Sequence, residues 1–185
     1  RTRGDCNYGN RNERILSGSN GWFNCNQFGN KYNIEAHSFT TGQEILNWAV
    51  DGKRTISAIV TGTGTGGTLM GCHKRIKPQF PDMKMVAVEP AESAVMSGGE
   101  PGLHGIQGIG DGSKFLVDMK AVSEVTRIKT EDAKSRAKQL AKEHGIFVGI
   151  SAGANILAAE KWIEDNDPTG IVVTFLCDRG DRYFS

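Results

Sequence analysis

Hydrophobic and polar positions along the chain predict alternating strands and helices from about residue 41 onwards. Short runs of β-branched and other apolar residues predict buried strands at 56–60, 83–88, 124–128 and 171–176. Apolar residues at helical spacing predict helices at 42–50, 69–76, 130–144 and 152–164. Strands that alternate with helices favour a mostly parallel sheet with helices on both faces. The sequence therefore predicts an α/β fold, a three-layer αβα sandwich.

The first 33 residues show no such pattern. They are rich in Asn, Gly, Ser and Arg, and only residues 21–28 resemble a short strand that leads into a loop. We therefore expect an irregular connecting segment at 1–33 and one α/β domain at 34–185. Because the chain begins with Arg1 and stops at Ser185, directly after an apolar strand and a turn, we expect a piece of a longer protein.

Charge, hydropathy and cysteine content argue against nucleic acid, membrane and metal partners. The chain has 22 Lys and Arg against 21 Asp and Glu, a formal net charge of +1, which gives no electrostatic footprint for nucleic acid. No apolar run approaches the roughly 20 residues that a membrane helix needs, so no membrane partner is expected. The four cysteines are scattered without a CxxC pair, which predicts no metal site and free thiols in a reducing cytoplasm. Whether Cys6 pairs with Cys25 stays open.

A glycine-rich loop with the sequence GTGTGGT, residues 62–68, follows a predicted strand and opens a predicted helix. Backbone N–H groups at a helix start lack partners within the helix, and the helix dipole there favours negative charge. Glycine lets the backbone approach an anion closely, so the loop predicts a phosphate site. It contains no lysine and is one residue short of GxGxxG, which argues against a Walker-type or dinucleotide site. The alternative is a tight turn that holds no ligand.

A second junction of this kind is GISAGA, residues 149–154, between an apolar run and a helix. Ser151 stands where an N-cap residue is expected, and a cap accounts for its hydroxyl without any ligand. From the residues alone, helix capping is the simpler interpretation.

Further motifs accompany these two in a fixed order. They read NQFGN (26–30), EAH (35–37), TTGQEI (40–45), VEPAESAVMSGG (88–99), GIQGIG (105–110) and GDRYFS (180–185). Together with the two glycine motifs, this series resembles the cysteine synthase and cystathionine β-synthase family of fold type II pyridoxal-phosphate enzymes. The resemblance runs from Gln27 to Ser185, and the VEPAESAV and IQGIG motifs favour cysteine synthase.

The resemblance implies a cofactor, pyridoxal 5′-phosphate, and residues that bind it. The residues matching the family's phosphate loop are Gly64, Thr65, Gly66, Gly67 and Thr68. Ser151 matches the residue that hydrogen-bonds the pyridine nitrogen, and its neutral hydroxyl would leave that nitrogen unprotonated, as suits β-elimination. Gln27 and Gly108 match positions close to the substrate. The resemblance thus favours a cofactor role for Ser151 beyond helix capping.

The implied activity of the complete protein is cysteine synthesis from O-acetylserine and sulfide by β-replacement, in a cytoplasmic homodimer. The alternative within the family is a cystathionine β-synthase-like or other β-replacement enzyme. Since the family's Schiff-base lysine is expected upstream, we expect no catalytic residue in this chain, and the chain alone to be inactive.

Two further points stay open at this stage. The chain departs from the family at Asp111, Ser113 and Lys114, where small and apolar residues are usual, and this puts the substrate preference in doubt. A hypothesis of a different class is a non-catalytic binding or regulatory module that lacks the lysine segment.

Overall fold

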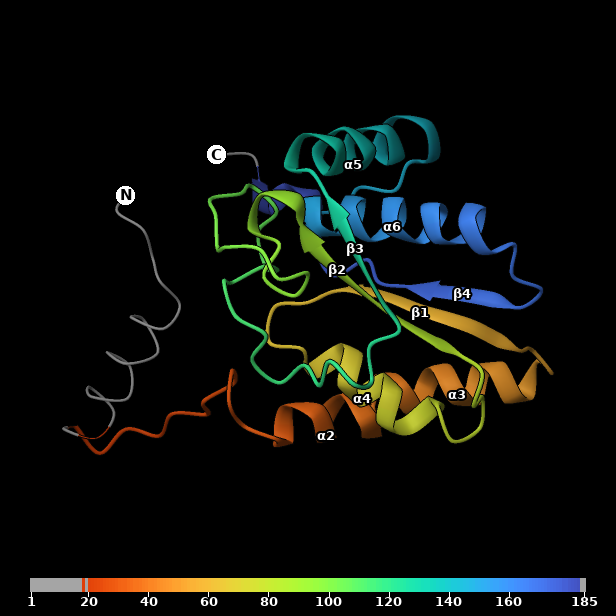
Figure 1. The fold of residues 1–185 in the computed structure, drawn as a ribbon, viewed down its shortest axis with the longest axis horizontal. Coiled ribbons are helices and arrows are strands. Elements are labelled where there is room, and N and C mark those ends of the chain that lie inside the picture. The colour runs from red at the N-terminus through yellow and green to blue at the C-terminus, as the bar shows by residue number, and fades with distance from the viewer. Residues whose placement is uncertain (1–17, 19, 184–185) are drawn as a thin grey trace.

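The computed structural model describes residue 18 and residues 20–183 of the chain. Its centre is a four-stranded, fully parallel sheet in the order β3-β2-β1-β4 (Figure 1). The strands are β1 (Ile56–Gly62), β2 (Lys84–Pro90), β3 (Glu124–Ile128) and β4 (Ile171–Thr174). All four predicted strands therefore belong to one sheet, as expected.

Helices cover both faces of the sheet. One face carries α2 (Tyr32–Phe39), α3 (Thr41–Asp51) and α4 (Gly67–Ile76), and the other carries α6 (Ile150–Asn166), over which α5 (Thr130–His144) lies (Figure 1). Two short 3-10 helices follow β2 and β4, η1 (Ala91–Ser93) and η2 (Gly180–Tyr183). The three-layer αβα sandwich is confirmed. Among the described residues, no helix is both long and apolar enough to cross a bilayer.

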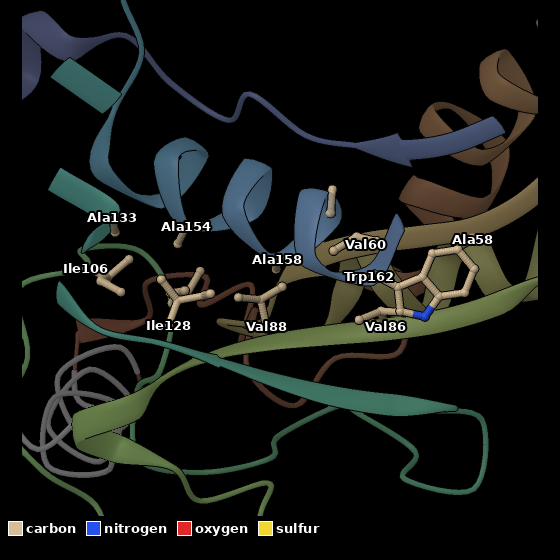
Figure 2. Packing of buried hydrophobic residues seen from close by; sticks show 12 residues of the cluster. Ala58, Val60, Val86, Val88, Ile106, Ile128, Ala133, Ala154, Ala158 and Trp162 are labelled. Atoms are coloured by element: carbon tan, nitrogen blue, oxygen red, sulfur yellow. The ribbon is translucent and has the colours of Figure 1, made fainter. Parts of the chain in front are cut away.

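Alternation along the strands sends side chains into two cores. Val60 and Val88 pack toward α6, while their neighbours Ile59 and Ala87 pack toward the helices of the opposite face. The core against α6 contains, among others, Ala58, Val86, Ile106, Ile128, Ala154, Ala158 and Trp162 (Figure 2). Packing on both faces holds the strands in place, so the loops that leave their carboxyl ends start from fixed positions.

The amino-terminal region differs from expectation in two places. Residues 21–28 form no strand. Asn26 has a positive φ of 49°, and its carbonyl oxygen accepts bonds from the amides of Gly29 and Asn30, which makes a tight turn. Helix α2 was not predicted and begins at Tyr32. The division into 1–33 and 34–185 stays a prediction, and Cys6 lies outside the described residues.

The order of the strands determines where a ligand can enter. The chain passes from β1 through α4 to β2 on one side of β1, and β4 later joins the sheet on the other side. The loops that leave the carboxyl ends of β1 and β4 therefore diverge and leave a crevice. In open parallel sheets, ligands bind at such a point.

Candidate functional site

A cavity of about 640 Å³ lies at this crevice. It is lined by all eight residues that the sequence singled out: Gln27, Gly64, Thr65, Gly66, Gly67, Thr68, Gly108 and Ser151. They come from four separate segments of the chain. The structure brings them together, and their individual roles stay predictions. The loop after β4 adds Cys177, Asp178, Arg182 and Tyr183 to the wall.

Residues 64–68, called the cradle from here on, lead from β1 into α4. Helix α4 starts at Gly67, with Gly66 as its N-cap residue. Within the described part of the chain, the amides of Gly64, Thr65, Gly66 and Thr68 donate to no protein acceptor. These unpartnered donors lie at the positive end of the helix dipole, so the cradle is suited to bind an anion.

Two glycines of the cradle are required by their surroundings. Gly66 has φ +86°, and a Cβ there would lie 2.5 Å from Cγ2 of Val117. A Cβ on Gly64 would lie 2.7 Å from the carbonyl oxygen of Gly108. Side chains at these positions would fill the space beside the free amides. The cradle thus has both the donors and the room that the phosphate of pyridoxal phosphate needs.

The two threonines of the cradle are held from α2. Oγ1 of Thr65 accepts bonds from the backbone amide of Gly67 at 3.2 Å and from Nδ2 of Asn33 at 3.1 Å. Oγ1 of Thr68 lies 3.4 Å from Nε2 of His37. Burial lowers the pKa of His37, which favours the neutral imidazole. Asn33 and His37 were not predicted as site residues, although both lie in or beside the motifs.

Ser151 does not cap α6. The N-cap residue is Gly149, and Ser151 is the second residue of the helix, buried and in the wall of the cavity. The helix begins earlier than expected, and the amide of its N-cap residue Gly149 donates to the carbonyl oxygen of Asp178 at 3.0 Å. The capping interpretation of Ser151 is therefore wrong.

The wall next to Ser151 combines the protonatable groups of Cys177 and Tyr183 with the charged side chains of Asp178 and Arg182. Burial raises the pKa of the Cys177 thiol and the charge of Asp178 raises it further, against hydrogen bonds from Ser151 and Asn155. The hydroxyl of Tyr183 donates to Oδ2 of Asp178 at 2.6 Å. Burial, together with this bond, raises the pKa of Tyr183 to about 12. Neither Cys177 nor Tyr183 ionises at neutral pH, so both face the cavity region of Ser151 as neutral groups.

The lining of the cavity also includes an acid beside the cradle. Asp111 lines the cavity, and its Oδ2 lies 3.4 Å from the position of a Cβ on Gly64. Among the described lining residues there is no lysine. Lys74 pairs with Glu35 instead, and Lys114 is exposed. Within residues 20–183, no group of three or more His, Cys, Asp and Glu side chains is placed to hold a metal ion.

Comparisons with known proteins show what this chain is similar to. The family model described as "Pyridoxal-phosphate dependent enzyme" matches residues 6–178. A cysteine synthase of Staphylococcus aureus is 40% identical over 173 residues, which is 92% of this chain and 54% of that protein. The chain thus spans about half the length of the curated relatives it matches.

Solved structures give the same result. Cysteine synthase from Entamoeba histolytica superimposes with a TM-score of 0.85 at 37% identity, over 96% of this chain and 52% of that one. O-acetylserine dependent cystathionine β-synthase from Helicobacter pylori superimposes with a TM-score of 0.83 at 31% identity, over 94% of this chain and 56% of that one. The resemblance and the fold inferred from the sequence are both confirmed.

Proposed function

Because the chain belongs to the pyridoxal-phosphate dependent enzyme family, we propose that the full-length protein makes cysteine from O-acetylserine and sulfide by β-replacement. The carbon–oxygen bond to acetate breaks, acetate leaves, and sulfide forms the new carbon–sulfur bond. When bound, pyridoxal phosphate supplies the electron sink for this exchange. The observation that carries the proposal is the convergence of all eight predicted residues on one cavity.

The cradle is assigned to the phosphate of the cofactor. The amides of Gly64, Thr65, Gly66 and Thr68 supply hydrogen-bond donors without rearrangement, since they have no protein acceptor in the described chain. The start of α4 adds the favourable end of the helix dipole. A phosphate held there would leave the rest of the cavity, which Ser151, Gln27 and Gly108 line, for the remainder of the cofactor and the substrate.

Ser151 is assigned to the pyridine nitrogen, and Gln27 and Gly108 to the substrate. Cys177 and Tyr183, which line the cavity with Ser151, stay protonated at physiological pH. A neutral hydroxyl next to the ring nitrogen leaves that nitrogen unprotonated, which limits charge delocalisation to what β-replacement needs. Gln27 and Gly108 lie on either side of the cradle in sequence and line the same cavity.

The imine-forming lysine is assigned to a part of the protein outside this chain. Residues 34–185 then form the domain that binds the cofactor phosphate, and residues 1–33 connect it to the lysine-bearing part. We assign the complete protein to the cytoplasm and to a homodimer, as in the family it resembles.

Reconstitution tests this division. The chain alone should give no visible imine band and no cysteine from O-acetylserine and sulfide. Addition of the lysine-bearing segment, covalently or as a second chain, should restore both. If borohydride instead trapped pyridoxal phosphate stoichiometrically on a lysine of this chain, and turnover accompanied the trapping, the assignment of the lysine would be wrong.

A second candidate function is supported by Asp111. Its carboxylate adds negative charge to a cavity whose cradle is assigned to the phosphate, which disfavours the entry of a further anion such as hydrosulfide. An amino-acid thiol carries an ammonium group that this carboxylate attracts. This favours a cystathionine β-synthase-like reaction with a thiol-bearing amino acid as the nucleophile.

The ratio of kcat/KM for homocysteine to kcat/KM for sulfide separates the two candidates. If Asp111 attracts the ammonium group, Asp111→Asn should lower that ratio by roughly 10-fold, the worth of about one charged contact. Asp118→Asn is the matched control, because Asp118 is exposed and does not line the cavity. An unchanged ratio in Asp111→Asn would remove the support for the second candidate.

A further inference from the structure

We infer that Asn33 is a positioning residue, which forces the hydroxyl of Thr65 to donate into the cavity and ties the cradle to the loop of Gln27. The inference rests on the proposed function, since the group that would receive this bond is the cofactor phosphate. Asn33 is the second residue of α2, a helix that the sequence pattern did not reveal.

Both hydrogens of the Asn33 carboxamide are in use. Nδ2 donates to the carbonyl oxygen of Gln27 at 2.8 Å and to Oγ1 of Thr65 at 3.1 Å. An amide nitrogen has two hydrogens, so these two bonds exhaust it. The orientation of the carboxamide is determined by Gln27, because a backbone carbonyl oxygen accepts hydrogen bonds only, and Oδ1 cannot take that place.

The hydroxyl of Thr65 has only one direction left in which it can donate a hydrogen bond. A hydroxyl has two acceptor lone pairs and one hydrogen. Its lone pairs are taken by Nδ2 of Asn33 and by the amide of Gly67, at 3.1 and 3.2 Å. Its hydrogen has no protein acceptor among the described residues, and Thr65 lines the cavity. The O–H therefore points where the amides of the cradle point, and it becomes a fixed donor for an anion.

The position of the Asn33 carboxamide also explains why residue 67 is a glycine. A Cβ on Gly67 would collide with Asn33, so the first residue of α4 has to be glycine for Asn33 to approach. This requirement is separate from those of Gly64 and Gly66, whose neighbours are Gly108 and Val117. Through its bond to Gln27, Asn33 further joins the phosphate end of the cavity to the proposed substrate end.

The test is a double-mutant cycle in the full-length protein with pyridoxine 5′-phosphate, which lacks the aldehyde and cannot bind a lysine covalently. Its dissociation constant is measured by equilibrium dialysis for wild type, Asn33→Ala, Thr65→Val and the double variant. Asn33→Ala should weaken binding roughly 5- to 10-fold in the wild-type background, the worth of one hydrogen bond. It should weaken binding less than about 2-fold when Thr65 is already valine.

A second substitution and a control complete the cycle. Asn33→Asp keeps the shape of the side chain but donates nothing, so it should weaken binding more than Asn33→Ala does. Asn30→Ala removes a neighbouring carboxamide that, among the described residues, bonds to the carbonyl oxygen of Cys25 and the amide of Tyr32 and not to the cradle, so it should leave the dissociation constant unchanged.

The outcomes are distinguishable. Equal losses from Asn33→Ala in both backgrounds, or wild-type affinity in Asn33→Asp, would overturn the inference and leave the proposed function intact. Wild-type protein that fails to bind pyridoxine 5′-phosphate would overturn the proposed function and the inference with it.

Discussion

Two helices, α4 and α6, begin at the same cavity and do so in different ways. Before α4, four amides of the cradle have no protein acceptor among the described residues, and the N-cap residue Gly66 has a left-handed conformation. At α6, the amide of the N-cap residue Gly149 is bonded to Asp178, and buried Ser151 lines the cavity. The chain around the start of α4 lines the cavity with residues 64–69, whereas α6 contributes Ser151 alone.

The difference shows that two glycine-rich strand-to-helix junctions can present different chemical groups to the same cavity. The cradle combines free amides with glycines that leave room for a dianion, whereas at α6 the N-cap amide is paired with Asp178 and a serine side chain lines the cavity. Under the proposed function, the phosphate lies at the α4 junction and the ring nitrogen at the α6 junction. Substitutions at the α4 junction should therefore reduce cofactor affinity, and substitutions at the α6 junction should reduce turnover.

The largest effect is expected at the α4 junction. Gly66→Val places a β-branched residue at φ +86° and drives its side chain into Val117. We expect the affinity for pyridoxal phosphate to fall at least about 100-fold, since strain and collision together displace the free amides. Equilibrium dialysis of the full-length variant measures this loss.

Gly98→Val is the matched control for that prediction. Gly98 has nearly the same φ, +87°, but nothing lies within 4 Å of a Cβ there, and it does not line the cavity. It should cost some stability through backbone strain and leave cofactor affinity unchanged. Equal losses of affinity in the two variants would mean that the cradle is not the phosphate site.

An intermediate effect is expected at the α6 junction. Ser151→Ala should lower kcat by about 10-fold, the worth of one hydrogen bond, while cofactor affinity changes much less because the cradle still holds the phosphate. Steady-state kinetics and dialysis on the same preparation measure both. Ser38→Ala is the control, since Ser38 is a buried helical serine outside the cavity. If Ser151→Ala lost affinity as severely as Gly66→Val, the proposed division of labour would be wrong.

The smallest expected effect is a pH dependence of the folding stability, and it arises from His37, which lies next to Thr68 of the cradle. Burial lowers the pKa of His37 below its unfolded value of 6.5, so the folded state binds fewer protons than the unfolded state near that pH. Stability should therefore fall as pH drops through about 6.5. Solvent screening limits the contribution of this half-exposed side chain to a few tenths of a kcal/mol, as an order of magnitude.

Urea denaturation at pH 7.5 and 5.5 measures that dependence. His37→Gln should reduce the loss of stability between the two pH values. His73 needs a parallel variant, because burial and Lys77 lower its pKa in the same direction, with Asp118 opposing. A His37→Gln protein with the full wild-type loss would show that the titrating group lies elsewhere.

The regular part of the fold was accessible from the sequence because it depends on buried apolar residues. Helix α5 runs over Thr130–His144 and ends before Gly145 at φ +67°, as the pattern predicted. Helix α2 escaped prediction because it approaches α4 through Asn33, His37 and Gly71 instead of an apolar stripe. Only Ser38 of this helix is fully buried, so it leaves no hydrophobic period.

The candidate site was accessible for a different reason. Its eight residues were found through short sequence motifs. Such motifs can be recognised without knowing which side chains are buried. Asn33 was missed because its role depends on contacts across the fold, to Gln27 and Thr65, that no local spacing reveals. Ser151 was first interpreted as a cap because the bond from Gly149 to Asp178 joins segments far apart in the sequence.

A crystal structure of the full-length protein with pyridoxal 5′-phosphate bound tests the central claim most directly. The account predicts phosphate oxygens within about 3 Å of amide nitrogens of the cradle, and the Ser151 hydroxyl at the same distance from the pyridine nitrogen. A cofactor whose phosphate lies outside the cradle, with the amides of Gly64, Thr65, Gly66 and Thr68 still unpartnered, would contradict it.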